Sequence, residues 1–169
     1  MTLQKKICMV GVFGTGKTAL VQRYVHSIFT AKYLTTIGVK IDKKEVRTGG
    51  ETVTLMLWDL EGRDATREVS TSYLRGAHGL IYVVDGTRRE TFDQIFEIRD
   101  LATRELGELP SVIAFNKTDL TSEWRLEASD EQHEALRGCH RLRTSAKTGE
   151  GVEAAFNWLA QATLRPAGA

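Results

Sequence analysis

The sequence has little of what marks secreted, membrane-spanning or nucleic-acid-binding chains. Its 169 residues include two Cys, Cys8 and Cys139, and two Pro, too few for a disulfide framework or a polyproline linker, so we expect a reducing, cytoplasmic setting. No apolar run approaches the ~20 residues needed to span a bilayer. Lys and Arg total 23 against 22 Asp and Glu. This balance lacks the surplus of positive charge that nucleic acids or anionic membranes attract.

The length and composition predict one folded domain. Hydrophobic residues make up 41% of the chain and charged residues 27%, values that are ordinary for a soluble globular protein and unlike those of a disordered one. A chain of this length is close to the typical size of one domain. We therefore expect a single domain over residues 1–169.

Apolar, β-branched runs alternate with amphipathic stretches. The pattern predicts strands at residues 5–10, 38–47, 51–58, 79–85, 111–116 and 142–145. It predicts helices at 17–28, 91–106 and 129–137, the last capped by Ser129, and from Val152 to Leu159. Thr48-Gly49-Gly50 predicts a hairpin turn between the second and third strands. This order indicates an α/β fold with a mostly parallel sheet of about six strands and about five helices on its two faces.

A glycine-rich segment follows the first predicted strand. Gly11 to Thr18 matches GxxxxGK[ST], whose backbone N–H groups encircle the phosphates of a nucleotide at a helix N-terminus. Lys17 would reach the β- and γ-phosphates, and the Thr18 hydroxyl would bind Mg²⁺. The alternative is a turn that merely joins strand to helix. The motif predicts a three-layer P-loop NTPase fold with phosphate contacts from Phe13, Gly14, Thr15, Gly16, Lys17, Thr18 and Ala19.

Two polar segments follow later strands and concern the choice of base. Asn116-Lys117-Thr118-Asp119 comes after the strand at 111–116, and Ser145-Ala146-Lys147 comes after the last strand. Ligands bind at the carboxyl ends of parallel strands, so these segments should lie near the phosphate loop. The Asp119 carboxylate can accept two hydrogen bonds from guanine, a donor pair that adenine does not offer. We therefore predict guanine as the base.

Together these segments resemble the Ras superfamily of small GTPases, and most closely its Rab branch. Thr36-Ile37-Gly38-Val39 and Ser72 to Gly79 are similar to Rab switch segments, and the resemblance extends from about residue 5 to residue 163. It implies a G domain that binds GTP and GDP with Mg²⁺. It also implies effector, exchange-factor and GTPase-activating partners at switch I (about 30–40) and switch II (about 59–75).

The resemblance further implies roles for particular residues. Thr36 would bind Mg²⁺ and contact the γ-phosphate, Asp59 would hold Mg²⁺ through water, and the Gly62 N–H would touch the γ-phosphate. On the base side, Phe29 would pack edge-on against guanine, Lys117 would lie over its face, and the Ala146 N–H would donate to the base oxygen. The remaining base-site residues implied are Asn116, Asp119, Ser145 and Lys147.

The sequence departs from the family at two catalytic positions. Arg63 stands where the family has the Gln that orients the attacking water, and Phe13 stands where the Ras branch has Gly. Arg63 is either a lost water-positioning group or an arginine that stabilises the transferring phosphoryl group in cis. With Lys17, Thr36 and Gly62, it completes the expected catalytic set. We expect slow hydrolysis; the alternative is a GTP-binding interaction module with negligible turnover.

Two further expectations concern partners and membranes. The resemblance implies an apolar partner-binding patch formed by Ile41, Trp58 and Tyr73, although the two aromatic residues could instead pack in the core. The chain has no C-terminal Cys, and Thr2 follows Met1, so we expect neither a prenyl nor a myristoyl anchor in this chain. A lipidated tail could have been removed.

Overall fold

The computed structural model describes residues 2–30, 38–60 and 71–165. Within these ranges, six strands form one sheet in the order β2-β3-β1-β4-β5-β6. The β2–β3 pair is antiparallel and the other neighbouring pairs are parallel. The predicted α/β fold is confirmed. The strands are β1 (Leu3–Val10), β2 (Val39–Thr48), β3 (Glu51–Leu60), β4 (Gly79–Asp85), β5 (Ser111–Asn116) and β6 (His140–Arg143).

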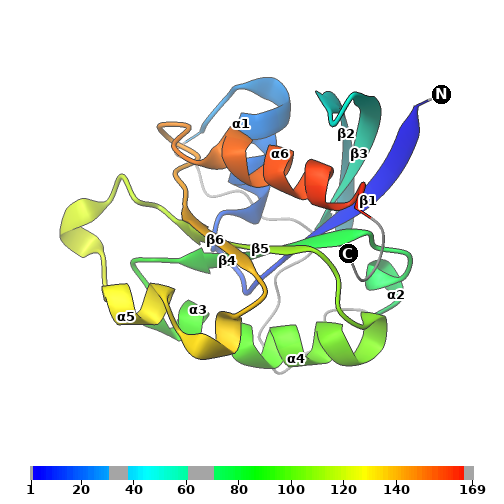
Figure 1. Cartoon of the computed structure of the whole chain (residues 1–169). Helices are drawn as coiled ribbons and strands as arrows, with labels where there is room; N and C mark the ends of the chain where they lie inside the picture. Colours follow the sequence, from blue (N-terminus) through cyan, green and yellow to red (C-terminus); the bar gives the residue numbers. More distant parts are fainter. Residues whose placement is uncertain (1, 31–37, 61–70, 166–169) are drawn as a thin grey trace.

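Helices cover both faces of the sheet (Figure 1). They are α1 (Lys17–His26), α2 (Thr71–Leu74), α3 (Arg89–Asp93), α4 (Ile95–Leu106), α5 (Ala128–Glu131) and α6 (Val152–Ala162), with 3₁₀ helices η1 (Thr121–Glu123) and η2 (Glu134–Leu136). Helices α1 and α6 lie on one face, and α3, α4 and α5 lie on the other (Figure 1). In the part of the chain that is described, no helix has both the length and the apolar character needed to cross a membrane.

Each face of the sheet has its own hydrophobic core. Leu20 of α1 and Phe156 of α6 belong to the core on one face, while Phe92 of α3 and Ile98 of α4 belong to the core on the other. All residues of β4 and β5 are buried, because a central parallel strand is covered by helices on both sides. This explains the uninterrupted apolar runs by which both strands are recognisable in the sequence.

The hairpin lies where the sequence predicts it. Thr48 pairs with Glu51, and Gly49 and Gly50 between them have φ values of 58° and 81°. Positive φ at both central residues is what a tight two-residue hairpin turn requires, and Gly adopts it without a steric penalty. The turn fixes the register of β2 on β3, and the candidate metal-binding residue Asp59 is the last but one residue of β3.

The predicted helix at 129–137 was wrong. The structure has instead the short helix α5 and the 3₁₀ helix η2, with Glu127 rather than Ser129 at the N-cap. The Glu127 N–H donates to the Asp130 carboxylate at 2.8 Å, and Arg89 makes two hydrogen bonds to the same carboxylate at 2.7 and 2.8 Å. These contacts from a distant element fix the turn of the chain, and local periodicity does not reveal them.

Two other boundaries also differ from those predicted. The stretch predicted as one helix at 91–106 is divided into α3 and α4 at Gln94, which keeps right-handed helical dihedral angles. Strand β6 runs over His140–Arg143 rather than 142–145, because the Ser145 N–H donates to the Glu150 carbonyl instead of continuing the sheet. The earlier end of β6 leaves Ser145 in a loop at the rim of the sheet.

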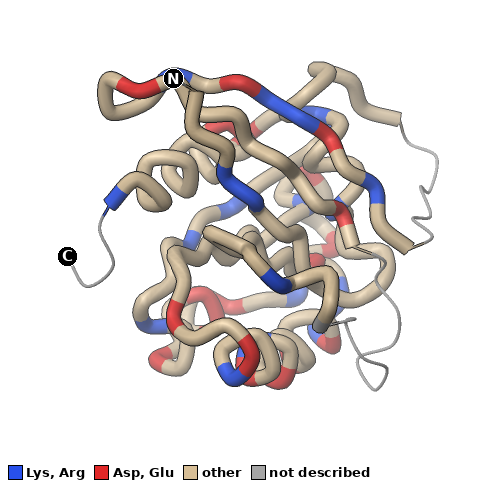
Figure 2. Tube along the Cα trace, turned by 90° about the vertical axis from the view of Figure 1, so that its right-hand side faces the viewer, with Lys and Arg blue, Asp and Glu red and all other residues tan. Residues whose placement is uncertain are grey.

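Charges of both signs are interspersed along the described chain (Figure 2). Edge strand β2 carries Lys40, Lys43 and Lys44 together with Asp42 and Glu45. Charged side chains on an edge strand discourage pairing with the edges of other sheets.

Candidate functional site

The glycine-rich segment joins β1 to α1 at the carboxyl edge of the sheet. Gly14 and Gly16 have φ values of 77° and 101°, a region that residues with a Cβ atom rarely adopt. A Cβ atom on Gly16 would also lie 2.3 Å from the Asn116 side-chain nitrogen. The loop therefore requires Gly at this position for both its backbone conformation and its contact with the segment after β5.

Lys17 lies inside this loop. Its side-chain nitrogen donates to the carbonyl oxygens of Gly11 at 3.0 Å and Val12 at 2.9 Å, and only 6% of the residue is exposed. Burial lowers the pKa of Lys17 to about 8; the nearby Asp59 opposes this shift and the positive charge of Arg88 adds to it. A buried ammonium held by the carbonyls of the loop can neutralise an anionic group that binds there.

Thr18 and Asp59 form an oxygen-rich pair between the start of α1 and the end of β3. The Thr18 hydroxyl donates to the Asp59 carboxylate at 2.6 Å, and Asp59 is 1% exposed. No cluster of three or more His, Cys, Asp or Glu side chains suited to a metal ion occurs among the described residues. Mg²⁺ in nucleotide sites needs only one or two protein oxygens, since waters and phosphates complete its shell. The pair therefore fits Mg²⁺.

Asn116 connects the glycine-rich loop to both later segments. Its side-chain nitrogen donates to the Thr15 carbonyl at 3.0 Å, and its side-chain oxygen accepts from the Thr144 hydroxyl at 3.0 Å. Asn116 is buried, as are Thr15 and Thr144. Three loops that are far apart in the sequence therefore meet at this one amide.

Side chains near Asn116 make further contacts at this carboxyl edge of the sheet, which we call the rim. Lys117 has a φ of 73°, which is uncommon for a residue other than Gly, and its side-chain nitrogen donates to the Gly14 carbonyl at 3.0 Å. The Ser145 hydroxyl donates to the Asp119 carboxylate at 2.7 Å. Ala146 follows as a buried residue. The structure thus brings the two predicted base-site segments together beside the glycine-rich loop.

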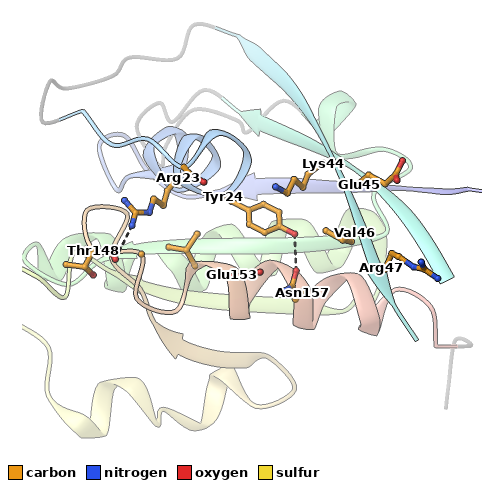
Figure 3. A pocket seen from close by; sticks show the side chains of 12 residues that line it. Arg23, Tyr24, Lys44, Glu45, Val46, Arg47, Thr148, Glu153 and Asn157 are labelled. Atoms are coloured by element: carbon orange, nitrogen blue, oxygen red, sulfur yellow. Dashed lines mark hydrogen bonds between the residues drawn. The ribbon is translucent and has the colours of Figure 1, made fainter. Parts of the chain in front are cut away.

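The other candidate residues are more peripheral. Phe13 and Phe29 are 47% and 39% exposed, Ala19 packs at the edge of a core, and Lys147 is exposed. The Lys147 carbonyl accepts a hydrogen bond from Arg23 at 3.2 Å. Arg23 also lines a cavity of about 590 Å³ between α1, β2 and α6 (Figure 3). The loop after β6 is thereby held against α1.

Several predicted residues lie outside the described residues. They are Thr36, Gly62 and Arg63. Of the proposed partner patch, Ile41 is 43% exposed, while Trp58 and Tyr73 are partly buried and pack against a core. The Lys6 ammonium lies 3.6 Å from the centroid of a Trp58 ring, which is a close cation–π contact.

Sequence reasoning missed three residues of the rim: Thr144, Asp85 and Arg88. Asp85 is the last residue of β4 and is 1% exposed. Its carboxylate forms a salt bridge with the Lys117 ammonium at 2.8 Å. Arg88 donates to the Phe13 carbonyl at 2.7 Å. A carboxylate at the end of a buried strand was the available signal for Asp85, because ligand sites gather at the carboxyl ends of such strands.

The chain is similar to known proteins over most of its length. The model of the Ras family matches residues 6–165 of the chain. Two relatives, the Ras-related protein Rab-1 of Theileria parva and that of Theileria annulata, are each 34% identical to it over 160 residues. Each match covers 93% of this chain and 73% of the relative.

Proposed function

Because this chain belongs to the Ras family of small GTPases, we propose that it is a GTP/GDP switch whose hydrolysis step is slow. Members of the family bind GTP and GDP and hydrolyse GTP, so the chain is a GTPase. We assign the nucleotide site to the place where three loops meet at Asn116, beside the buried Lys17.

The proposed phosphate site is the loop from Phe13 to Ala19. Its N–H groups and Lys17 would bind the phosphates, and the N-terminal end of α1 would favour their negative charge. Mg²⁺, when bound, neutralises negative charge that develops during phosphoryl transfer. Thr18, Asp59 and Thr36 would hold it.

The proposed base site lies beside this loop. Asp119, oriented by the Ser145 hydroxyl, would accept hydrogen bonds from the guanine ring N–H and amino group. The Ala146 N–H would donate to the base oxygen. Phe29 and the stem of Lys117 would enclose the ring, while Asn116 and Lys147 would support the surrounding loops. These roles extend the family resemblance to the residues of this chain.

Slow hydrolysis rests on Arg63 and Phe13. Phosphoryl transfer depends on positioning and on charge stabilisation, so loss of the water-orienting Gln should slow it. Phe13 places a half-exposed ring on the loop that would bind the phosphates. These same residues support the second candidate function, a GTP-bound interaction module with negligible turnover. In either case we propose a cytoplasmic protein whose effectors and regulators bind switch I and switch II.

Single-turnover hydrolysis of bound GTP tests the proposed rate and the role of Arg63. If Arg63 is a lost water-positioning group, Arg63→Gln should raise the rate about tenfold, because a Gln can orient the attacking water. A rate that falls in Arg63→Gln would contradict this and identify Arg63 as the stabilising arginine. No measurable turnover in either protein would favour the interaction module.

A second prediction concerns the metal-binding role of Thr18. In Thr18→Asn, GTP affinity measured with Mg²⁺ should fall about tenfold more than GDP affinity, because the γ-phosphate and the hydroxyl share the ion. The comparison is made by competition binding of both nucleotides. Repeating it in EDTA is the control, since the difference should then disappear. Equal losses for GTP and GDP would count against the role.

A further inference from the structure

Arg88 extends from the end of β4 to the glycine-rich loop. Its backbone N–H donates to the Asp85 carbonyl at 3.0 Å, and its side-chain Nε donates to the Asp85 carboxylate at 3.1 Å. A second nitrogen of the same guanidinium donates to the Phe13 carbonyl at 2.7 Å. Arg88 thus connects a buried carboxylate to the backbone of the loop that would bind the phosphates.

Lys117, which directly follows β5, makes a second connection of the same kind. Its ammonium lies 2.8 Å from the same Asp85 carboxylate oxygen and donates to the Gly14 carbonyl at 3.0 Å. One carboxylate therefore holds two cations, and each cation bonds to one of two successive carbonyls of the loop. We refer to Asp85, Arg88 and Lys117 as the loop clamp.

Asp85 is suited to hold both cations. Burial alone would raise its pKa, but hydrogen bonds from the Lys117 side chain and from Thr87 more than offset this and lower the pKa below its usual value. Asp85 is 1% exposed, whereas the Arg88 and Lys117 side chains are 37% and 31% exposed. The carboxylate is therefore the fixed, ionised centre of the clamp.

The course of the chain from Asp85 to Arg88 is itself fixed. The Gly86 N–H donates to the Asn116 carbonyl at 3.0 Å, and the Gly86 carbonyl accepts from the Arg125 N–H at 2.8 Å. A Cβ atom on Gly86 would lie 2.0 Å from the Trp124 ring, so the ring packs directly on this backbone. Arg88 therefore projects from a well-supported segment.

The clamp has a consequence for the N–H groups of the loop. In a planar trans peptide, the C=O of one residue and the N–H of the next point in opposite directions. A Phe13 carbonyl held toward Arg88 turns the Gly14 N–H away from the clamp, and a Gly14 carbonyl held toward Lys117 does the same for the Thr15 N–H. These are N–H groups that a phosphate-binding loop presents to its anion.

We propose that Arg88 is a positioning residue of the phosphate site, which fixes the Phe13–Gly14 peptide and thereby slows nucleotide release. This inference rests on the proposed function of the loop. A guanidinium suits the task because its nitrogens lie in a fixed planar fork, so that different nitrogens donate to the carboxylate and to the carbonyl. Arg88 acts through the loop backbone and does not itself touch the nucleotide.

Release of a fluorescent GDP analogue into excess unlabelled GDP, with Mg²⁺ present, tests the proposal. Arg88→Ala should release the analogue about tenfold faster, an effect typical of losing a charge-assisted hydrogen bond at a partly exposed side chain. Arg88→Lys should restore part of the slow release. The ratio of GDP to IDP release rates should stay at its wild-type value, because the clamp concerns the phosphates rather than the base.

Arg89→Ala is the matched control. Arg89 is the adjacent arginine, and its exposed side chain pairs with the Asp130 carboxylate. Its removal also deletes an ion pair and should lower the melting temperature, but it should leave GDP release within about twofold of wild type. The amide signals of Gly14 and Thr15 in ¹⁵N spectra of the GDP form should shift in Arg88→Ala and not in Arg89→Ala.

The outcomes separate this inference from the proposed function. Unchanged GDP release in Arg88→Ala, with a wild-type protein that binds GDP, would overturn the role of Arg88 alone. Equal acceleration in Arg89→Ala would overturn it too, because the effect would then follow general stability. A wild-type protein that binds no guanine nucleotide would instead overturn the proposed function. If Arg88→Ala fails to fold, Arg88→Lys and its amide signals decide the question.

Discussion

Asp119→Asn should exchange guanine for xanthine as the preferred base, with a loss of GTP affinity on the order of 10³-fold or more. The carboxylate can accept from both the ring N–H and the amino group of guanine. An amide in its place presents one donor to the guanine amino group, which is also a donor. Xanthine has an oxygen at that position and can accept from the new amide, so its affinity should rise.

Binding of GDP and of xanthosine diphosphate to both proteins, measured by calorimetry, checks this result. The substitution is nearly isosteric, and the amide oxygen can still accept the hydrogen bond that the Ser145 hydroxyl makes to Asp119 at 2.7 Å. The surrounding loops should therefore keep their arrangement, and the melting temperature reports whether they do. Unchanged GDP affinity in Asp119→Asn would rule out this residue as the guanine contact.

Gly16→Ala should have the second-largest effect, a loss of GDP affinity of at least about 10²-fold. The new methyl group meets two obstacles. The backbone at Gly16 has a φ of 101°, and the methyl carbon would lie 2.3 Å from the Asn116 side-chain nitrogen. Relief of that overlap displaces Asn116, which donates to the Thr15 carbonyl. The phosphate loop and the base-side segments would then both move.

Gly50→Ala is the control that introduces backbone strain without a steric overlap. Gly50 also has a positive φ, of 81°, but nothing lies within 4 Å of a Cβ atom built there. It should therefore lose about 1 kcal/mol of stability from backbone strain alone and keep its GDP affinity. GDP titrations and thermal unfolding of both variants make the comparison. A Gly16→Ala protein that binds GDP like wild type would show that the loop is not the nucleotide site.

Strands β4 and β5 could be predicted because their local composition reflects their burial. In β4 and β5 every residue is buried, and each reads as a continuous apolar run between polar segments. The β2–β3 hairpin could be predicted because Gly49 and Gly50 supply the backbone conformation of its turn. In both cases the residues that specify the element lie within it.

The segment at 128–136 could not be predicted on these grounds. Its acidic residues suggested the first turn of one longer helix, but Asp130 bonds to Arg89 and Glu131 bonds to Arg143. Those partners are distant in the sequence, and they fix two short helical turns where a local pattern favours one helix. Tertiary contacts here override local helical preference.

The sequence predicted which residues belong to the candidate site better than it predicted the contacts between them. The glycine-rich motif and the polar segments after β5 and β6 identified residues that do meet at one rim of the sheet. Asp85 and Arg88 were missed, because their role depends on carbonyl groups of a loop more than 70 residues away in the sequence. The roles of Thr36, Gly62 and Arg63, which lie outside the described residues, remain predictions from the family resemblance.

The small molecule that the purified chain carries is the most direct test of whether this rim binds a guanine nucleotide. The protein is purified with Mg²⁺, denatured, and the released compounds are separated by ion-exchange chromatography. We predict GDP or GTP in close to one equivalent per chain, with GTP persisting because hydrolysis is slow. An adenine nucleotide in its place, or no nucleotide from a folded chain that also gives no heat with GDP, would contradict the guanine-nucleotide switch.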